Sequence, residues 1–158
     1  MRLLLDTHIA LWAIVDDPRL PSKACDLILD PKNAIYISAA TVWEISIKHT
    51  LKRETMPVSG AESLHHFRKS GYRFLPVSPE HAAKVEELPS LHPDPFDRIL
   101  VAQALSEPLI LMTHDSQLAR YGDFILLVCL PPGIPRKDRA KHGRKSAGAR
   151  TCRPCILG

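Results

Sequence analysis

Short apolar runs alternate along the chain with stretches in which apolar residues recur at helical spacing, a pattern typical of β-α-β units. The apolar runs predict strands near residues 2–5, 34–38, 73–77, 109–113 and 124–128. The helical spacing predicts helices near residues 7–14, 21–30, 40–51, 60–70, 79–88, 95–106 and 116–121. Because strands and helices alternate, we expect an α/β fold with a central, mostly parallel sheet.

Two of the predicted strands are apolar at every position. Residues 3–5 (Leu-Leu-Leu) belong to one, and residues 109–112 (Leu-Ile-Leu-Met) belong to the other. A strand without alternation is expected where helices cover both faces of the sheet, so these two strands are predicted to be the most central. Pro76 cannot donate a hydrogen bond to a neighbouring strand, and it therefore predicts an edge position for the strand near residues 73–77.

The composition changes after the last predicted strand. Residues 130–135 read Leu-Pro-Pro-Gly-Ile-Pro, and residues 131–158 carry a net charge of +7, whereas residues 1–130 carry −3. The basic segment has few large apolar residues and cannot bury enough surface to offset the entropy cost of ordering. We therefore predict one folded domain over residues 1–130 and a basic, disordered tail over residues 131–158. The Cys-x-x-Cys motif of this tail supplies too few ligands for a structural zinc site.

No membrane segment is expected. Asp6 and His8 interrupt the apolar run at the N-terminus, and no small-residue cleavage site follows it, so the run does not resemble a signal peptide. No stretch is long and apolar enough to span a bilayer. These features predict a cytoplasmic protein.

Four acidic residues stand where predicted apolar strands lead into predicted helices. Asp6 and Asp115 follow the two most apolar strands, Glu44 lies in the helix after the second strand, and Asp97 lies near the start of the helix at residues 95–106. The carboxyl ends of parallel strands share one edge of a sheet, so these side chains are expected to converge. Converging carboxylates repel one another unless a cation neutralises them, and oxygen ligands suit Mg²⁺ or Mn²⁺. The pattern therefore indicates a metal site of the kind that nucleases use.

Each acid also has a local explanation. Asp6, Asp94 and Asp115 are suitable N-caps for the helices that follow them. Glu44 and Lys48 lie four residues apart, which is the spacing of an ion pair on a helix surface. Capping and metal binding are compatible, and capping alone does not require four acids at one edge of the sheet.

Four segments around these acids resemble PIN-domain proteins, and within that family they are most similar to the VapC-type toxins of bacterial toxin–antitoxin pairs. In order, the segments are LLDTHIALW (residues 4–12), SAATVWEISIK (38–48), HPDPFDRILVAQA (92–104) and THD (113–115). The resemblance covers about residues 1–128. It implies a compact three-layer α/β/α fold, bound Mg²⁺ with Mn²⁺ as a substitute, endoribonuclease activity, a small cognate antitoxin as inhibitor, and a homodimer.

The resemblance also assigns roles to individual residues. It implies that the catalytic and metal-binding quartet consists of Asp6, Glu44, Asp97 and Asp115. Thr113 matches the hydroxyl residue that precedes the last acid in the family. We expect Asp94 to be mainly a helix cap, and we expect both Asp94 and Thr113 to support the quartet from outside.

The residue types agree with metal-assisted hydrolysis. No Ser-His-Asp order stands out, and no cysteine stands beside the acids in the sequence, so a covalent nucleophile is not indicated. Carboxylate-bound metal lowers the pKa of bound water and orients it for attack on a phosphodiester, which would leave a 5′-phosphate. Lys48 and Arg98 are the expected phosphate contacts because they lie beside Glu44 and Asp97.

Two alternatives compete with this function. Haloacid-dehalogenase-like phosphatases also begin with an aspartate after the first strand, but they need a second aspartate at the position that His8 occupies. A noncatalytic PIN-like module that binds RNA or a protein stays open, although the complete quartet argues against it. Trp12, Trp43 and Phe96 are expected to pack in the core rather than to stack on bases.

Overall fold

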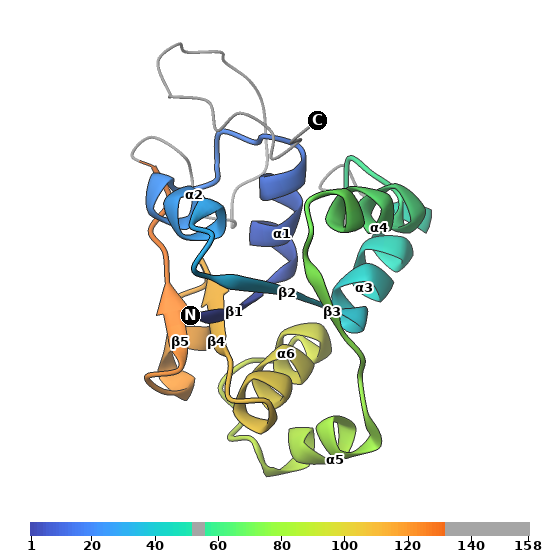
Figure 1. Cartoon of the computed structure of the whole chain (residues 1–158). Helices are drawn as coiled ribbons and strands as arrows, with labels where there is room; N and C mark the ends of the chain where they lie inside the picture. The colour runs from blue at the N-terminus through green and yellow to red at the C-terminus, as the bar shows by residue number, and fades with distance from the viewer. Residues whose placement is uncertain (52–55, 132–158) are drawn as a thin grey trace.

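A five-stranded parallel sheet runs through the middle of the protein, whose computed structural model describes residues 1–51 and 56–131 (Figure 1). The strands are β1 (Arg2–Leu5), β2 (Ala34–Ser38), β3 (Arg73–Leu75), β4 (Ile110–Thr113) and β5 (Ile125–Leu127), in the order β3-β2-β1-β4-β5. Leu4 of β1 pairs with Tyr36 of β2 on one side and with Leu111 of β4 on the other. The predicted α/β class is confirmed, and β3 lies at an edge as Pro76 indicated. Apart from Pro131, the predicted tail lies outside the described residues.

Helices cover both faces of this sheet, which gives the three predicted layers (Figure 1). One layer contains α1 (Thr7–Ile14), α2 (Ser22–Leu29) and α4 (Gly60–Lys69), and the other contains α5 (Pro79–Glu87) and α6 (Pro95–Ser106). The remaining helix, α3 (Ala39–Thr50), contacts both α4 and α6 and so connects the layers. Instead of the helix predicted at residues 116–121, a short 3₁₀ helix, η1 (Leu118–Tyr121), follows β4. Within the two described ranges, no helix is long and apolar enough to cross a membrane.

The uniform apolar character of β1 follows from its central position. Leu3 and Leu5 are fully buried in the core that packs against α1, α2 and α4. Leu4 points to the opposite face and is fully buried against α6. Successive side chains of a strand alternate between its two faces, so a strand with a core on each side has no polar position to expose.

The start of α6 combines two local signals. Asp94 is the N-cap, and its Oδ1 accepts a hydrogen bond from the Phe96 amide at 2.9 Å. Pro95 occupies the first helical position, where its missing N–H has no cost. Together they begin the helix so that Asp97 falls in its first turn.

The prediction that Trp43 packs in the core is wrong. Trp43 is 62% exposed, whereas Trp12 is 5% exposed and matches its prediction. Phe96 is half-buried, and its ring meets the Trp43 ring edge-on, with 5.2 Å between centroids. Helix α3 lies between the two helical layers and is not covered by either of them. One side of α3 therefore has no described residues packed against it.

Candidate active site

The order of the strands reverses between β1 and β4. From β1 the sheet continues through β2 and β3 on one side, and through β4 and β5 on the other side. In open parallel sheets the crevice at such a switch point, beyond the carboxyl ends of the strands, is the usual ligand-binding position. Asp6 follows β1 directly, and its amide donates to the carbonyl of Met112 in β4 at 3.0 Å. Asp115 lies just beyond β4. The two acids therefore flank the switch point.

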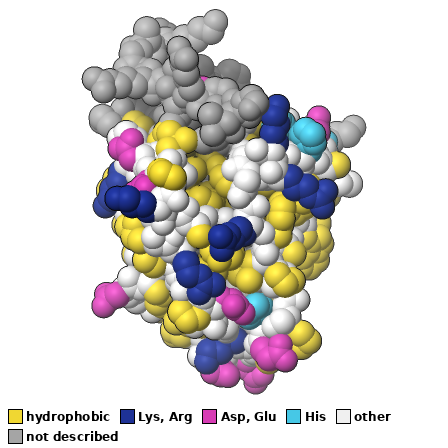
Figure 2. All heavy atoms as spheres, viewed as in Figure 1, with side chains coloured by type: hydrophobic (Ala, Val, Ile, Leu, Met, Phe, Trp, Pro, Cys, Tyr) yellow, Lys and Arg dark blue, Asp and Glu magenta, His cyan; other side chains and the backbone are white. Residues whose placement is uncertain are grey.

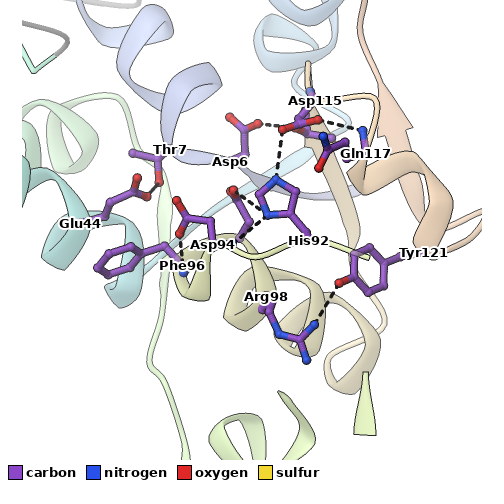
Figure 3. Close-up of polar contacts among 12 residues, drawn as sticks. Asp6, Thr7, Glu44, His92, Asp94, Phe96, Arg98, Asp115, Gln117 and Tyr121 are labelled. Atoms are coloured by element: carbon purple, nitrogen blue, oxygen red, sulfur yellow. Dashed lines mark hydrogen bonds and ion pairs between the residues drawn. The ribbon is translucent and has the colours of Figure 1, made fainter. Parts of the chain in front are cut away.

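The quartet is brought to this edge by four different parts of the chain, and Figure 3 shows how Asp6, Glu44 and Asp115 lie. Asp6 caps α1, with its Oδ1 accepting from the Ile9 amide at 2.8 Å. Glu44 is buried on α3, and Asp97 lies in the first turn of α6. Asp115 accepts from the Gln117 amide at 2.8 Å through its Oδ1. In Asp6, helix capping and membership of the quartet thus occur in the same residue, as the sequence allowed. The expected cap by Asp115 is not formed, because Gln117 is the N-cap of η1.

The pKa of Asp97 reflects how close the four carboxylates lie to one another. Burial raises this pKa to about 8, together with the negative charges of Asp6, Asp94, Glu44 and Asp115. At neutral pH and without a cation, Asp97 is therefore mainly protonated. Burial and the neighbouring acids together keep this carboxyl group neutral, and a bound cation would offset both effects.

Asp6 has the opposite tendency. Burial by itself favours its neutral form, but His114, His8 and the Ile9 amide outweigh burial and lower the pKa of Asp6 below its usual value. The Nδ1 of His114 lies 3.7 Å from Oδ2 of Asp6, a distance that makes the contact electrostatic rather than a hydrogen bond. The quartet therefore contains an ionised acid beside a protonated one.

Two threonine hydroxyls orient the two most deeply buried acids. Thr113 donates to Oδ2 of Asp6 and accepts from the Asp115 amide at 3.0 Å, so it connects the first and last acids of the quartet. Thr7, which is 2% exposed, donates to Oε2 of Glu44. Sequence reasoning did not single out Thr7; its position directly after Asp6, at the start of an apolar helix, was the available signal.

His92 was also missed as a member of the site. Its Nδ1 lies 3.4 Å from Oδ2 of Asp97, and its Nε2 lies 3.3 Å from Oδ2 of Asp115 (Figure 3). No spacing rule relates a histidine in the segment before α6 to an acid that follows β4. The contact could be found only after the two segments were placed in space.

The two basic residues expected to contact RNA have other partners. The guanidinium group of Arg98 donates to the carbonyl oxygens of Val85, Leu88 and Pro89 and to the hydroxyl of Tyr121. These bonds hold α6 to the end of α5 and to η1, so Arg98 does not fit the predicted role in RNA binding. Lys48 forms an ion pair with Oε1 of Glu44, which was the local alternative for this pair.

The donor set suits a hard divalent cation, although Glu44 has to turn to join it. Within residues 1–51 and 56–131, no three His, Cys, Asp or Glu side chains are arranged to hold a metal ion as they stand. Glu44 is turned toward Thr7 and Lys48, whereas Asp97 and Asp115 both lie against the His92 ring. Rotation of the Glu44 side chain toward Asp97 would present oxygen atoms from separate elements to one cation, the ligand chemistry that Mg²⁺ and Mn²⁺ prefer.

Basic side chains do not form a continuous stripe on the face drawn in Figure 2. Lys and Arg side chains are dispersed over that face, and acidic side chains gather at the end formed by α5. A hollow of about 350 Å³ is lined by parts of residues 28–35 and 70–73, at the amino ends of β2 and β3. It lies at the sheet edge opposite the quartet and has no part in the candidate site.

Comparison with known proteins gives a consistent result. The family model described as PIN domain matches residues 3–123. Ribonuclease VapC22 of Mycobacterium tuberculosis (strain ATCC 25618 / H37Rv) is 27% identical over 117 residues, which cover 73% of this chain and 88% of that protein.

Solved structures show the same fold. A chain in the structure of VapBC2 from Rickettsia felis, bound to a DNA fragment from their promoter, has a TM-score of 0.60 at 20% identity and covers 83% of this chain and 100% of its own length. A chain of VapBC-1 from nontypeable Haemophilus influenzae has a TM-score of 0.54 at 16% identity, over 82% of this chain and 98% of its own.

Proposed function

The chain belongs to the PIN-domain family, and from this premise we propose that it is a divalent-metal-dependent endoribonuclease that acts as the toxin of a toxin–antitoxin pair. The name of its relative, Ribonuclease VapC22, supports a nuclease that acts on RNA. The observation that carries the proposal is the meeting of Asp6, Glu44, Asp97 and Asp115 at the switch point, where burial and the neighbouring negative charges raise the pKa of Asp97 to about 8.

We propose that these four carboxylates hold Mg²⁺, with Mn²⁺ as a substitute. When bound, such a cation lowers the pKa of a water molecule and stabilises negative charge on a phosphate and on its leaving oxygen. Asp6 and Glu44 are buried and held by threonine hydroxyls, so they form the rigid part of the donor set. Asp97 and Asp115 are more exposed, with side chains 25% and 37% accessible, and they form the side that RNA would approach.

The residues of this chain would act on RNA by position and charge rather than by covalent attack. Hydrolysis through an activated water leaves a 5′-phosphate and a 3′-hydroxyl, because the water attacks phosphorus and the 3′ oxygen leaves. Lys48 pairs with Glu44 and is the phosphate contact that we retain.

The proposed protein partners are a small cognate antitoxin and a second copy of the chain. The VapBC structures among its structural relatives support the antitoxin. Exposed apolar side chains support the second copy: Trp43 on α3 is 62% exposed and its ring meets Phe96, and Leu51 at the C-cap of α3 is 61% exposed. Aromatic residues are enriched in protein–protein interfaces.

Cleavage of labelled total RNA tests the enzymatic proposal. Wild type with Mg²⁺ or Mn²⁺ is compared with Asp97→Asn, with an EDTA control, and with Asp26→Asn as a matched variant, because Asp26 is an exposed aspartate on α2. We expect discrete products with 5′-phosphates from wild type and Asp26→Asn, and none from Asp97→Asn or with EDTA.

The same experiment separates the noncatalytic alternative from the enzyme. If folded, metal-loaded wild type leaves the RNA intact but retains part of it on a filter, the PIN-like binding module becomes the better description. Cleavage that persists in Asp97→Asn would mean that the activity does not depend on the quartet.

A further inference from the structure

His92 stands between two acids of the quartet that come from different parts of the fold. It belongs to the segment that leads into α6, and its side chain is 9% exposed. One ring nitrogen approaches Asp97 in the first turn of α6. The other approaches Asp115 beyond β4 (Figure 3). The ring therefore spans the gap between the two more exposed carboxylates.

The hydrogen-bond partners of the His92 ring indicate which ring nitrogen carries the hydrogen. The amide of Asp94 donates to Nδ1 at 3.2 Å, so Nδ1 acts as an acceptor. In a neutral imidazole the other nitrogen then carries the hydrogen, and Nε2 donates to Oδ2 of Asp115 at 3.3 Å. The Asp94 amide at the N-cap of α6 thereby determines which ring nitrogen of His92 donates a hydrogen bond.

These contacts restrain acids that have few other partners. The second oxygen of Asp115 accepts from the Gln117 amide at 2.8 Å, so His92 and Gln117 together set the plane of this carboxylate. Oδ2 of Asp97 lies 3.4 Å from Nδ1 of the His92 ring. Removing the ring would leave Asp115 free to rotate and would open space beside Asp97.

We propose that His92 is a positioning residue that sets the separation of Asp97 and Asp115 for a divalent cation. The inference rests on the proposed function, because it needs the quartet to bind metal. Both ring nitrogens are engaged with protein atoms, so His92 acts through the two carboxylates rather than on the substrate. Groups that hydrogen-bond to metal ligands typically change metal affinity about 10- to 100-fold when they are removed.

The test is the dissociation constant for Mn²⁺, measured by calorimetry without RNA on wild type and three variants. His92→Ala removes both contacts, His92→Gln extends an amide N–H toward the position of Nε2, and His92→Asn places its amide near Nδ1. His65→Gln is the matched control, since His65 is exposed on α4. Melting temperatures without metal are measured for every variant.

We expect His92→Ala to weaken Mn²⁺ binding about 10- to 100-fold, as expected for removing a group that holds metal ligands. His92→Gln should recover most of the affinity and His92→Asn little of it, while their metal-free melting temperatures stay similar. An unchanged dissociation constant in His92→Ala would overturn the inference. An equal loss of Mn²⁺ affinity in all three variants, in step with their loss of thermal stability, would also overturn it, because that pattern indicates a packing role. If wild type binds no Mn²⁺, the proposed metal dependence itself fails, which is a separate result.

Discussion

Asp97→Asn is expected to stabilise the metal-free protein at alkaline pH, although it removes a proposed metal ligand. Burial and four neighbouring carboxylates raise the pKa of Asp97 from 3.8 to about 8 in the folded protein. Between these two values the folded protein retains a proton that the unfolded chain has released, so the stability of wild type falls as the pH rises toward 8. Asparagine has nearly the shape of a neutral aspartic acid and carries no charge, so the variant is spared this loss.

The size of the effect follows from the width of that pH interval. At about 1.36 kcal/mol per pH unit, the interval from 3.8 to about 8 corresponds to roughly 6 kcal/mol. The Asp97 side chain is 25% exposed, and neighbouring carboxylates can turn away from it once it ionises, which reduces the loss. We expect the variant to gain roughly 2–6 kcal/mol over wild type at pH 9 and almost nothing at pH 4.

Urea unfolding in EDTA at pH 4, 6, 7.5 and 9 measures this difference, with Asp26→Asn as the control for replacing an exposed aspartate. Addition of Mn²⁺ at pH 7.5 extends the assay, since a cation at 100 times its dissociation constant stabilises wild type by about 2.7 kcal/mol. The variant should respond much less. A difference between Asp97→Asn and wild type that does not change with pH would refute the reasoning, because it would mean that Asp97 titrates alike in the folded and unfolded chains.

Three further variants test other parts of the structure. Thr7→Val, which leaves a buried oxygen of Glu44 without its hydroxyl partner, should lower the free energy of unfolding by roughly 1–3 kcal/mol in urea titrations, and an unchanged value would show that Lys48 alone satisfies Glu44. Trp43→Asp should convert a dimer to a monomer in light-scattering measurements while leaving the melting temperature of the monomer nearly unchanged, and a persistent dimer would place the interface elsewhere. Arg98→Ala should destabilise the fold by roughly 2–4 kcal/mol, because it leaves several carbonyl oxygens unpaired, and should not alter the salt dependence of RNA binding; a smaller salt slope would restore Arg98 as a phosphate contact.

Much of the fold was predictable because its signals are local. The uniform apolar run at residues 3–5 predicted a central strand, and β1 is the middle strand of the sheet. Pro76 predicted an edge, and β3 ends at Leu75 directly before it. Asp94 and Pro95 predicted the start of α6. In each case the cause is the backbone chemistry of one residue or the burial of one short run, both of which can be inferred without knowing the rest of the structure.

That the four acids lie close together was also predictable, since parallel strands end at a common edge. Their protonation was not. The pKa of Asp97 is raised and that of Asp6 is lowered, and this division depends on which charges surround each group. His8 and His114 lie beside Asp6, whereas Asp97 has the charges of four acids around it as well as His92. A sequence lists these charges but does not give the distances between them.

The sequence by itself determined where strands and helices form, which acids follow the central strands, and which helix the Asp94-Pro95 pair begins. The tertiary structure alone decided which side chains meet: Thr7 with Glu44 across 37 residues, Thr113 with Asp6 across 107 residues, and His92 with Asp115. It also decided that Trp43 is exposed and that Arg98 binds carbonyl oxygens. The physical reason is that secondary structure responds to neighbours along the chain, whereas these contacts depend on the order of strands and the packing of helices that the whole sequence produces together.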